Sequence, residues 1–122
     1  MSGDVLRWGV LSTAKIGIEK VIPATAAAAR CEVVAIASRD LGRAQAAASR
    51  LGIARAFGSY EDLLADPDVD AVYNPLPNHL HAEWTIAAAR AGKHVLCEKP
   101  LATTASDVEL MIEACEAEGV LL

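Results

Sequence analysis

Short apolar runs alternate with longer segments of helical periodicity along the chain. Runs rich in Val, Ile and Leu predict strands at 7–11, 32–37, 70–74 and 95–97, and a weaker signal predicts another at 54–57. Helices are predicted after Ser12, over about 41–51, from Tyr60 to a stop at Asp66-Pro67, over about 80–91, and after Thr104. Strands that alternate with helices predict an α/β fold, a doubly wound parallel sheet with helices on both faces.

Capping signals and apolar stripes refine these helices. Ser59 and the Thr104–Asp107 pair have the spacing of amino-terminal caps, Gly52 is a stop signal, and Asn78 is expected to cap the helix at 80–91. Two apolar stripes each follow one side of a helix: Leu41, Ala44, Ala48 and Leu51 in one, and Val108, Met111, Ile112 and Cys115 in the last.

Composition and charge narrow the class of protein. Of the 122 residues, 53% are hydrophobic and 22% charged, which excludes a disordered chain. The net charge of −5 without a basic run excludes nucleic acid as a partner. There is no signal-like start and no apolar run of membrane-spanning length, so we expect a cytoplasmic protein. Three widely spaced cysteines indicate neither a disulfide framework nor a zinc site.

The first strand is followed by a substituted glycine fingerprint. In doubly wound sheets a helix amino terminus after this strand receives phosphates, and three glycines usually line it. Here residues 12–17 read STAKIG and keep only the last glycine. Small side chains still let a pyrophosphate approach, which makes the turn a candidate dinucleotide site: Ser12, Thr13, Ala14, Lys15 and Ile16. The alternative is an ordinary tight turn.

The end of the second strand indicates which dinucleotide. Enzymes that use NAD usually carry an acidic residue roughly 20 positions after the glycines, bonded to the ribose 2′-hydroxyl. Ser38 and Arg39 stand there instead, with Arg43 four residues after Arg39. A hydroxyl and guanidinium groups suit a 2′-phosphate, so we expect NADP(H), with NAD(H) or dual use as the alternative. The alternative interpretation is that both arginines are solvated surface residues and that Asp40 only caps the next helix.

The loop after the third long strand faces the same crevice. Its candidate cofactor-binding residues are Asn74, Pro75, Leu76, Asn78 and His79. His79 and His81 have no cysteine or carboxylate at a ligand spacing, so we expect no metal site. We interpret one of them as a polar lining residue and the other as a surface histidine at a helix start.

Glu98 and Lys99 follow the next strand, at the border of this crevice. Neighbours on a strand face opposite ways, so Lys99 can point to a substrate or a nicotinamide ribose while Glu98 is anchored elsewhere. A partly buried lysine can have the lowered pKa that proton transfer needs. The alternative is a charged strand exit onto the surface.

Four stretches in this order resemble the glucose–fructose oxidoreductase/inositol dehydrogenase/MocA family. They are WGVLSTAKIG at 8–17, VVAIASRD at 33–40, VYNPLPNHLH at 72–81 and CEKP at 97–100. The chain is most similar to the branch of NADP-dependent sugar and dihydrodiol oxidoreductases. The resemblance implies that the candidates named above hold a nicotinamide dinucleotide. It also implies that Lys99, positioned by Glu98, assists proton transfer, while hydride passes to or from a carbinol carbon of a sugar, polyol or diol.

The resemblance also implies a second α/β domain with the substrate pocket, which does not follow Leu122. Residues 119–122 look like the start of a sixth strand, so we expect 1–122 to be one dinucleotide-binding domain cut within that strand. We therefore expect little turnover from this chain alone, and an open strand edge suggests a homo-oligomer. The alternatives are a stand-alone dinucleotide-binding module with a sensing or interaction role, and a scaffold that binds nothing.

Overall fold

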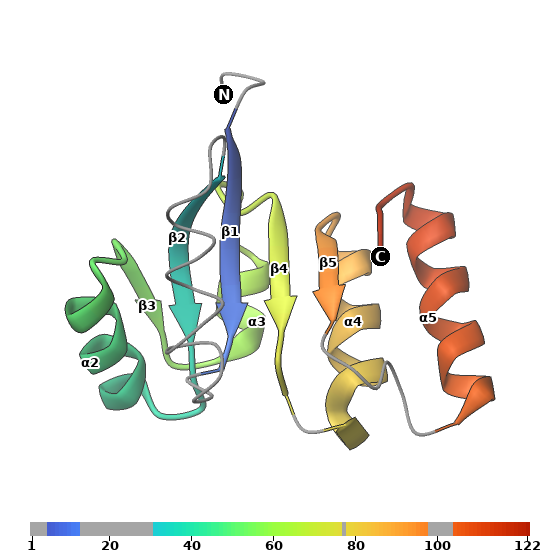
Figure 1. Cartoon of the computed structure of the whole chain (residues 1–122), viewed down its shortest axis with the longest axis horizontal. Helices are drawn as coiled ribbons and strands as arrows, with labels where there is room; N and C mark the ends of the chain where they lie inside the picture. The colour runs from blue at the N-terminus through green and yellow to red at the C-terminus, as the bar shows by residue number, and fades with distance from the viewer. Residues whose placement is uncertain (1–4, 13–30, 77, 98–103) are drawn as a thin grey trace.

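Five parallel strands form a single sheet in the order β3-β2-β1-β4-β5 (Figure 1). The computed structural model describes residues 5–12, 31–76, 78–97 and 104–122. The strands are β1 (Leu6–Leu11), β2 (Cys31–Ala37), β3 (Arg55–Phe57), β4 (Ala71–Asn74) and β5 (His94–Cys97). Their carboxyl ends meet at one edge of the sheet (Figure 1). This confirms the predicted doubly wound parallel fold.

The described helices begin and end close to the predicted positions. They are α2 (Leu41–Leu51), α3 (Tyr60–Leu64), the 3₁₀ helix η2 (Asn78–Leu80), α4 (His81–Arg90) and α5 (Ala105–Glu118). The side chains of Ser59 and Thr104 accept hydrogen bonds from the backbone N–H groups of Asp62 and Asp107, as their spacing predicts. Gly52 ends α2 with φ 71°, a conformation that glycine adopts at little cost.

The sheet separates two apolar clusters, and successive strand residues point to opposite ones. On one face Leu11 packs with Leu63 of α3 and Ala88 of α4. On the other face Val10 packs with Ile36, Ala48 and the segment that follows α2. Burial on both faces explains why the strands are near-continuous apolar runs. β1 and β4 pair side by side in the sheet, and the crevice opens at the carboxyl ends of these two strands.

The two apolar stripes of α2 and α5 are buried only in part. Leu41 is 46% exposed, because α2 packs through Ala44, Ala47 and Ala48, and its first residue lies beyond that stripe. Ile112 is 41% exposed, because α5 buries only the narrow stripe of Met111 and Cys115.

Asn78 does not cap α4. It opens η2 instead, and the cap position of α4 is Leu80, which makes no side-chain cap hydrogen bond. The 3₁₀ turn therefore separates Asn78 from His81, the first residue of α4. The sequence pattern did not reveal this short turn.

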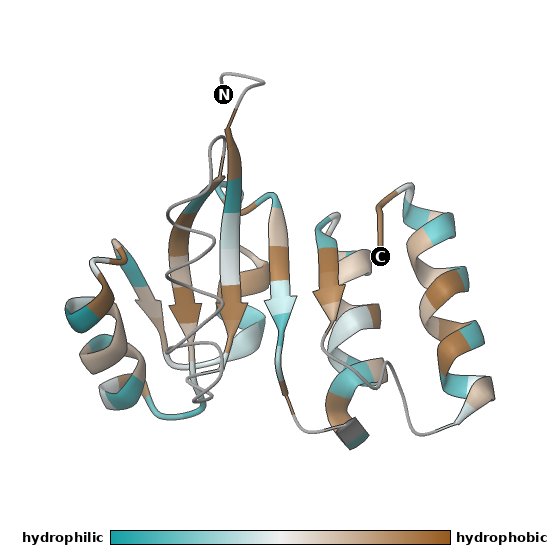
Figure 2. Cartoon of the chain, viewed as in Figure 1, coloured by the Kyte–Doolittle hydropathy of each residue, from teal (hydrophilic) through white to brown (hydrophobic). Residues whose placement is uncertain are grey.

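The end of the chain lies along β5, at the edge where a sixth strand would pair. Val95 N donates to Leu121 O at 2.9 Å, and Leu121 N donates to His94 Nδ1 at 3.0 Å. Figure 2 shows this hydrophobic segment between β5 and α5. Residues 119–122 do not themselves form a strand. Among the described residues, no helix is both long and apolar enough to cross a membrane.

Candidate functional site

A cleft of about 460 Å³ opens at the carboxyl edge of the sheet. Its walls come from the residues that follow β1, β2 and β4, and from the start of α3. The lining residues are Ser12, Ser38, Arg39, Asp40, Arg43, Tyr60, Leu76, His79 and Leu80. Six of these were predicted as cofactor-binding from the sequence, and the fold brings them into one cavity of a volume typical for small-ligand sites.

The end of β2 is held rigidly where it enters the cleft. Ser38 is only 8% exposed, and its backbone N–H donates to Phe57 O of β3 at 3.1 Å. Its hydroxyl oxygen accepts a hydrogen bond from Asp40 N at 3.3 Å. This anchoring fixes the backbone from which the exposed Arg39 projects.

Asp40 caps α2 and is also paired with Arg43. One carboxylate oxygen accepts a hydrogen bond from Gly42 N at 2.9 Å, and the other lies 4.0 Å from Arg43 Nε. Both side chains are exposed, at 65% for Asp40 and 77% for Arg43, so solvent screens the ion pair. The capping role considered for Asp40 is therefore real, and it coexists with a cleft that Arg39 and Arg43 both line.

The donor set of the cleft fits the phosphate end of a dinucleotide. Two guanidinium groups and the hydroxyls of Ser12 and Ser38 can donate to an anion, and one oxygen of Asp40 accepts the cap hydrogen bond from Gly42 N. Leu76 and Leu80 give the same cleft an apolar wall suited to a flat ring. The residues present thus fit an adenosine that carries an extra phosphate.

Tyr60 is a lining residue that sequence reasoning missed. It is 7% exposed, and burial raises the pKa of its hydroxyl, while the nearby Arg39 guanidinium acts in the opposite direction. Its sequence neighbour Ser59 signalled only a helix cap. Nothing local in the sequence indicates that α3 begins against the end of β2.

The loop after β4 is organised from within by Asn74. This side chain has no exposed surface, and its amide donates to Thr85 Oγ1 at 3.1 Å and to His81 O at 3.3 Å. Its amide oxygen accepts a hydrogen bond from Leu76 N at 3.2 Å. Asn74 therefore supports the loop, and any contact it makes with a dinucleotide would have to pass through its backbone.

The two histidines of this loop have different environments. His79 is exposed and lines the cleft, as expected of one of them. His81 is 1% exposed, with its ring hydrogen-bonded to Leu76 O, so the expectation of a surface histidine at the helix start is wrong. The described part of the chain contains no group of three or more His, Cys, Asp or Glu residues able to hold a metal ion.

Ser12 takes the place of the fingerprint's first glycine and keeps a glycine-like backbone. Its φ is 141°, and it is the only non-glycine residue in the described part of the chain with positive φ. A conformation of this kind costs of order 1–3 kcal/mol in a residue with a Cβ. Ser12 therefore has a backbone conformation that favours glycine, at the position where the fingerprint has its first glycine.

Several predicted site residues lie outside the described residues. They are Thr13, Ala14, Lys15 and Ile16 of the first turn, and Glu98 and Lys99 after β5. Pro75 is described and partly buried, but it does not line the cleft. The helix expected after Ser12 falls in the same undescribed part.

Comparison with known families agrees with this architecture. Residues 6–122 match the oxidoreductase family with an NAD-binding Rossmann fold named for glucose–fructose oxidoreductase, inositol dehydrogenase and MocA. The chain belongs to this family. The expectation drawn from the four motifs is confirmed.

Individual members of the family are similar over almost all of the chain. An uncharacterized oxidoreductase of Rhizobium meliloti is 57% identical over 95% of this chain. D-xylose 1-dehydrogenase (NADP(+)) 2 of Haloferax volcanii is 55% identical over 96% of it. The crystal structure of KijD10, a 3-ketoreductase from Actinomadura kijaniata in complex with NADP and TDP-benzene, superposes on 97% of the chain with a TM-score of 0.93 and 45% identity.

These family members are much longer than the chain. It covers 35% and 36% of the two curated relatives, and 36% of the KijD10 chain. The chain thus spans about a third of the length of the proteins it matches.

Proposed function

We propose that the cleft at the carboxyl edge of the sheet binds NADP(H) through the 2′-phosphate of its adenosine. The observation that carries this proposal is the convergence of Ser38, Arg39 and Arg43 on one cavity. Asp40, the carboxylate in the cleft lining, caps α2 through one oxygen, and its other oxygen lies 4.0 Å from the Arg43 guanidinium, which partly offsets its charge. Use of NAD(H) instead is the alternative that the experiment below distinguishes.

We further propose that this chain is the dinucleotide-binding part of an oxidoreductase acting on a carbinol carbon of a sugar, polyol or diol. Membership of an oxidoreductase family supports the class of reaction, and the xylose dehydrogenase and the 3-ketoreductase support the class of substrate. When bound, the nicotinamide would supply the hydride chemistry. The residues of the cleft would hold the adenosine end, and Lys99 and Glu98 remain the proposed groups for proton transfer and its positioning.

Substitution of the two cleft arginines tests the cofactor proposal. Arg39→Gln and Arg43→Gln should each weaken binding of 2′,5′-ADP by about tenfold or more, because each removes a charge-assisted hydrogen bond to the extra phosphate. Binding of 5′-ADP should stay within about twofold, since it lacks that phosphate.

Arg50→Gln is the matched control, because Arg50 is an exposed arginine in the last turn of α2 and does not line the cleft. Equal weakening of both nucleotides by the cleft variants, or an equal effect of the control, would contradict the proposal.

We also propose that the protein self-associates. Leu96 and Leu121 are 49% and 74% exposed, and both line an apolar groove beside β5. Exposed apolar surface of this kind commonly marks a contact between protein surfaces.

A cytoplasmic location remains our proposal as well. It is supported by Cys31, Cys97 and Cys115, which form no disulfide within the described part of the chain.

A further inference from the structure

We propose that Tyr60 is a positioning residue that holds the Arg39 guanidinium in place for the 2′-phosphate, and so sets the preference between NADPH and NADH. This inference rests on the proposed function of the cleft. It assigns a role to a side chain of α3, an element outside the dinucleotide-binding motifs of the sequence.

Tyr60 is itself rigidly fixed. It is the first residue of α3, whose cap is the hydrogen bond from Asp62 N to Ser59 Oγ at 3.1 Å. Its ring meets the ring of Trp84 edge-to-face, with centroids 5.0 Å apart and planes at 78°. This is the favoured arrangement for an aromatic pair, and both residues belong to the apolar core cluster that packs α3 and α4 on the sheet.

The side chain of Arg39 is not packed in this way. Its backbone follows the anchored Ser38, but its side chain is exposed at the cleft. A free arginine side chain loses rotamer freedom when a ligand immobilises it, and this loss weakens binding. A fixed acceptor beside the guanidinium removes part of this loss before the ligand arrives.

The hydroxyl of Tyr60 is suited to be that acceptor. Tyr60 and Arg39 line the same cleft, from the start of α3 and the end of β2 respectively. Burial raises the pKa of the Tyr60 phenol, and the nearby Arg39 guanidinium acts against that rise, which a cation beside the hydroxyl would do. A buried ring with its polar end at the rim of a cleft can thus orient a charge without touching the phosphate.

Tyr60→Phe tests the inference, because it removes the hydroxyl and keeps the ring against Trp84. We expect NADPH affinity to fall by about three- to tenfold, the range of one net hydrogen bond, with NADH affinity unchanged. In an Arg39→Gln background the same substitution should cause no further loss. An unchanged NADPH-to-NADH ratio, an equal loss for both dinucleotides, or a full additional loss in the Arg39→Gln background would overturn the inference.

A second readout needs no dinucleotide. Titration of the two tyrosines by ultraviolet absorbance should show one phenol titrating at higher pH in Arg39→Gln and no change in Arg50→Gln. If the chain fails to prefer NADPH but this shift is seen, the cofactor proposal fails while the pairing of Tyr60 with Arg39 stands. Absence of the shift would overturn the pairing and the positioning role with it.

Discussion

At the scale of single residues, Ser12 combines a place in the cleft lining with a strained backbone. Its φ of 141° lies where glycine is free and other residues are not. It also lines the cleft, where small size and a hydroxyl donor both suit a phosphate ligand. Strain at such a position is held by the surrounding fold, and here β1 and its two neighbouring strands supply that constraint.

Ser12→Gly is therefore expected to stabilise the chain. Relief of the strained φ should exceed the entropy that glycine adds to the unfolded chain, for a net gain of about 1 kcal/mol in the free energy of unfolding. Ser12→Ala keeps the Cβ and the strain, so it should show no gain. Urea denaturation of the two variants measures the difference, and a loss of stability in Ser12→Gly would be the opposite of what we expect.

Cleft residues that directly follow a strand could be predicted from the sequence. A cleft residue that tertiary packing of another helix places there could not. Ser38, Arg39 and Arg43 follow β2 directly, and the rule that ligands bind at strand carboxyl ends is enough to find them. Tyr60 enters the cleft because α3 packs against the end of β2. That packing depends on tertiary contacts, which no local pattern records.

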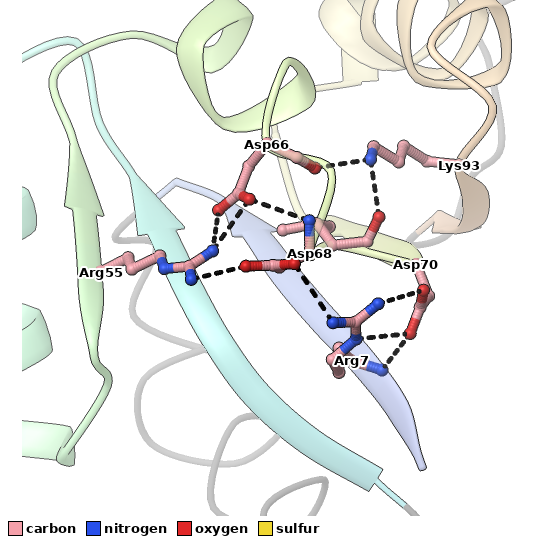
Figure 3. Close-up of polar contacts among 7 residues, drawn as sticks. Arg7, Arg55, Asp66, Asp68, Asp70 and Lys93 are labelled. Carbon is pink, nitrogen blue, oxygen red and sulfur yellow. Dashed lines mark hydrogen bonds and ion pairs between the residues drawn. The ribbon is translucent and has the colours of Figure 1, made fainter. Parts of the chain in front are cut away.

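At the scale of elements, a charged network stabilises the opposite edge of the sheet, at the amino ends of the strands (Figure 3). Arg55 bonds both oxygens of Asp66, at 2.8 and 2.7 Å, and reaches Asp68 at 2.6 Å. Arg7 forms a bidentate pair with Asp70, in which Nε donates to one carboxylate oxygen and Nη2 to the other. These ion pairs hold the loop between α3 and β4, so that β4 enters the sheet in register beside β1.

Lys93 completes this network from the start of β5. It is 6% exposed, and its Nζ donates to Asp66 O at 2.7 Å and to Val69 O at 2.6 Å. Burial lowers the pKa of its ammonium, and the nearby charges of Asp66 and Asp70 act against that effect. The ammonium therefore ties β5 to the same loop through two buried carbonyl groups.

Asp66→Asn should lower the free energy of unfolding by about 1–3 kcal/mol at neutral pH, because it weakens a buried, charge-assisted contact. Burial raises the pKa of Asp66, but hydrogen bonds from Asp68 N and Arg55 bring it below its ordinary value. The stability it contributes is thus complete above its ordinary pKa of about 4, and is lost as the pH falls through the lower pKa of the folded state.

The measurement is chemical denaturation of the unsubstituted chain and of Asp66→Asn between neutral and strongly acidic pH. The difference in stability should shrink toward acid, with Glu109→Gln, an exposed change on α5, as a control that shows none. A difference that stays constant with pH would contradict the ionic origin of the effect. The network lies at the edge opposite the cleft, so dinucleotide affinity should not change.

Element type could be predicted from the sequence better than helix orientation. Strand runs and cap pairs are local signals, and they placed β1, β2, α2 and the start of α5 within a residue or two. The buried stripes of α2 and α5 could not be assigned as reliably. Alanine-rich helices present small apolar residues on several sides, and their neighbours decide which side is buried.

At the scale of the whole molecule, the arginines of the cleft and the arginines of the stabilising network lie at opposite edges of the sheet. The net charge is −5, yet Arg39 and Arg43 converge on the cleft while Arg7 and Arg55 are bound by aspartates at the far edge. An anionic ligand is thus attracted to one local region of an acidic protein. The chain spans about a third of the length of its relatives. Dinucleotide binding at the cleft is therefore the property that can be tested directly on this chain.

Calorimetric titration of the purified chain with NADPH and then with NADH tests the central claim most directly. We expect NADPH to bind at least about tenfold more tightly, the contribution of one or more charge-assisted hydrogen bonds to the 2′-phosphate. Equal affinities, tighter binding of NADH, or no binding of either dinucleotide to the folded chain would contradict the assignment of the cleft to NADP(H).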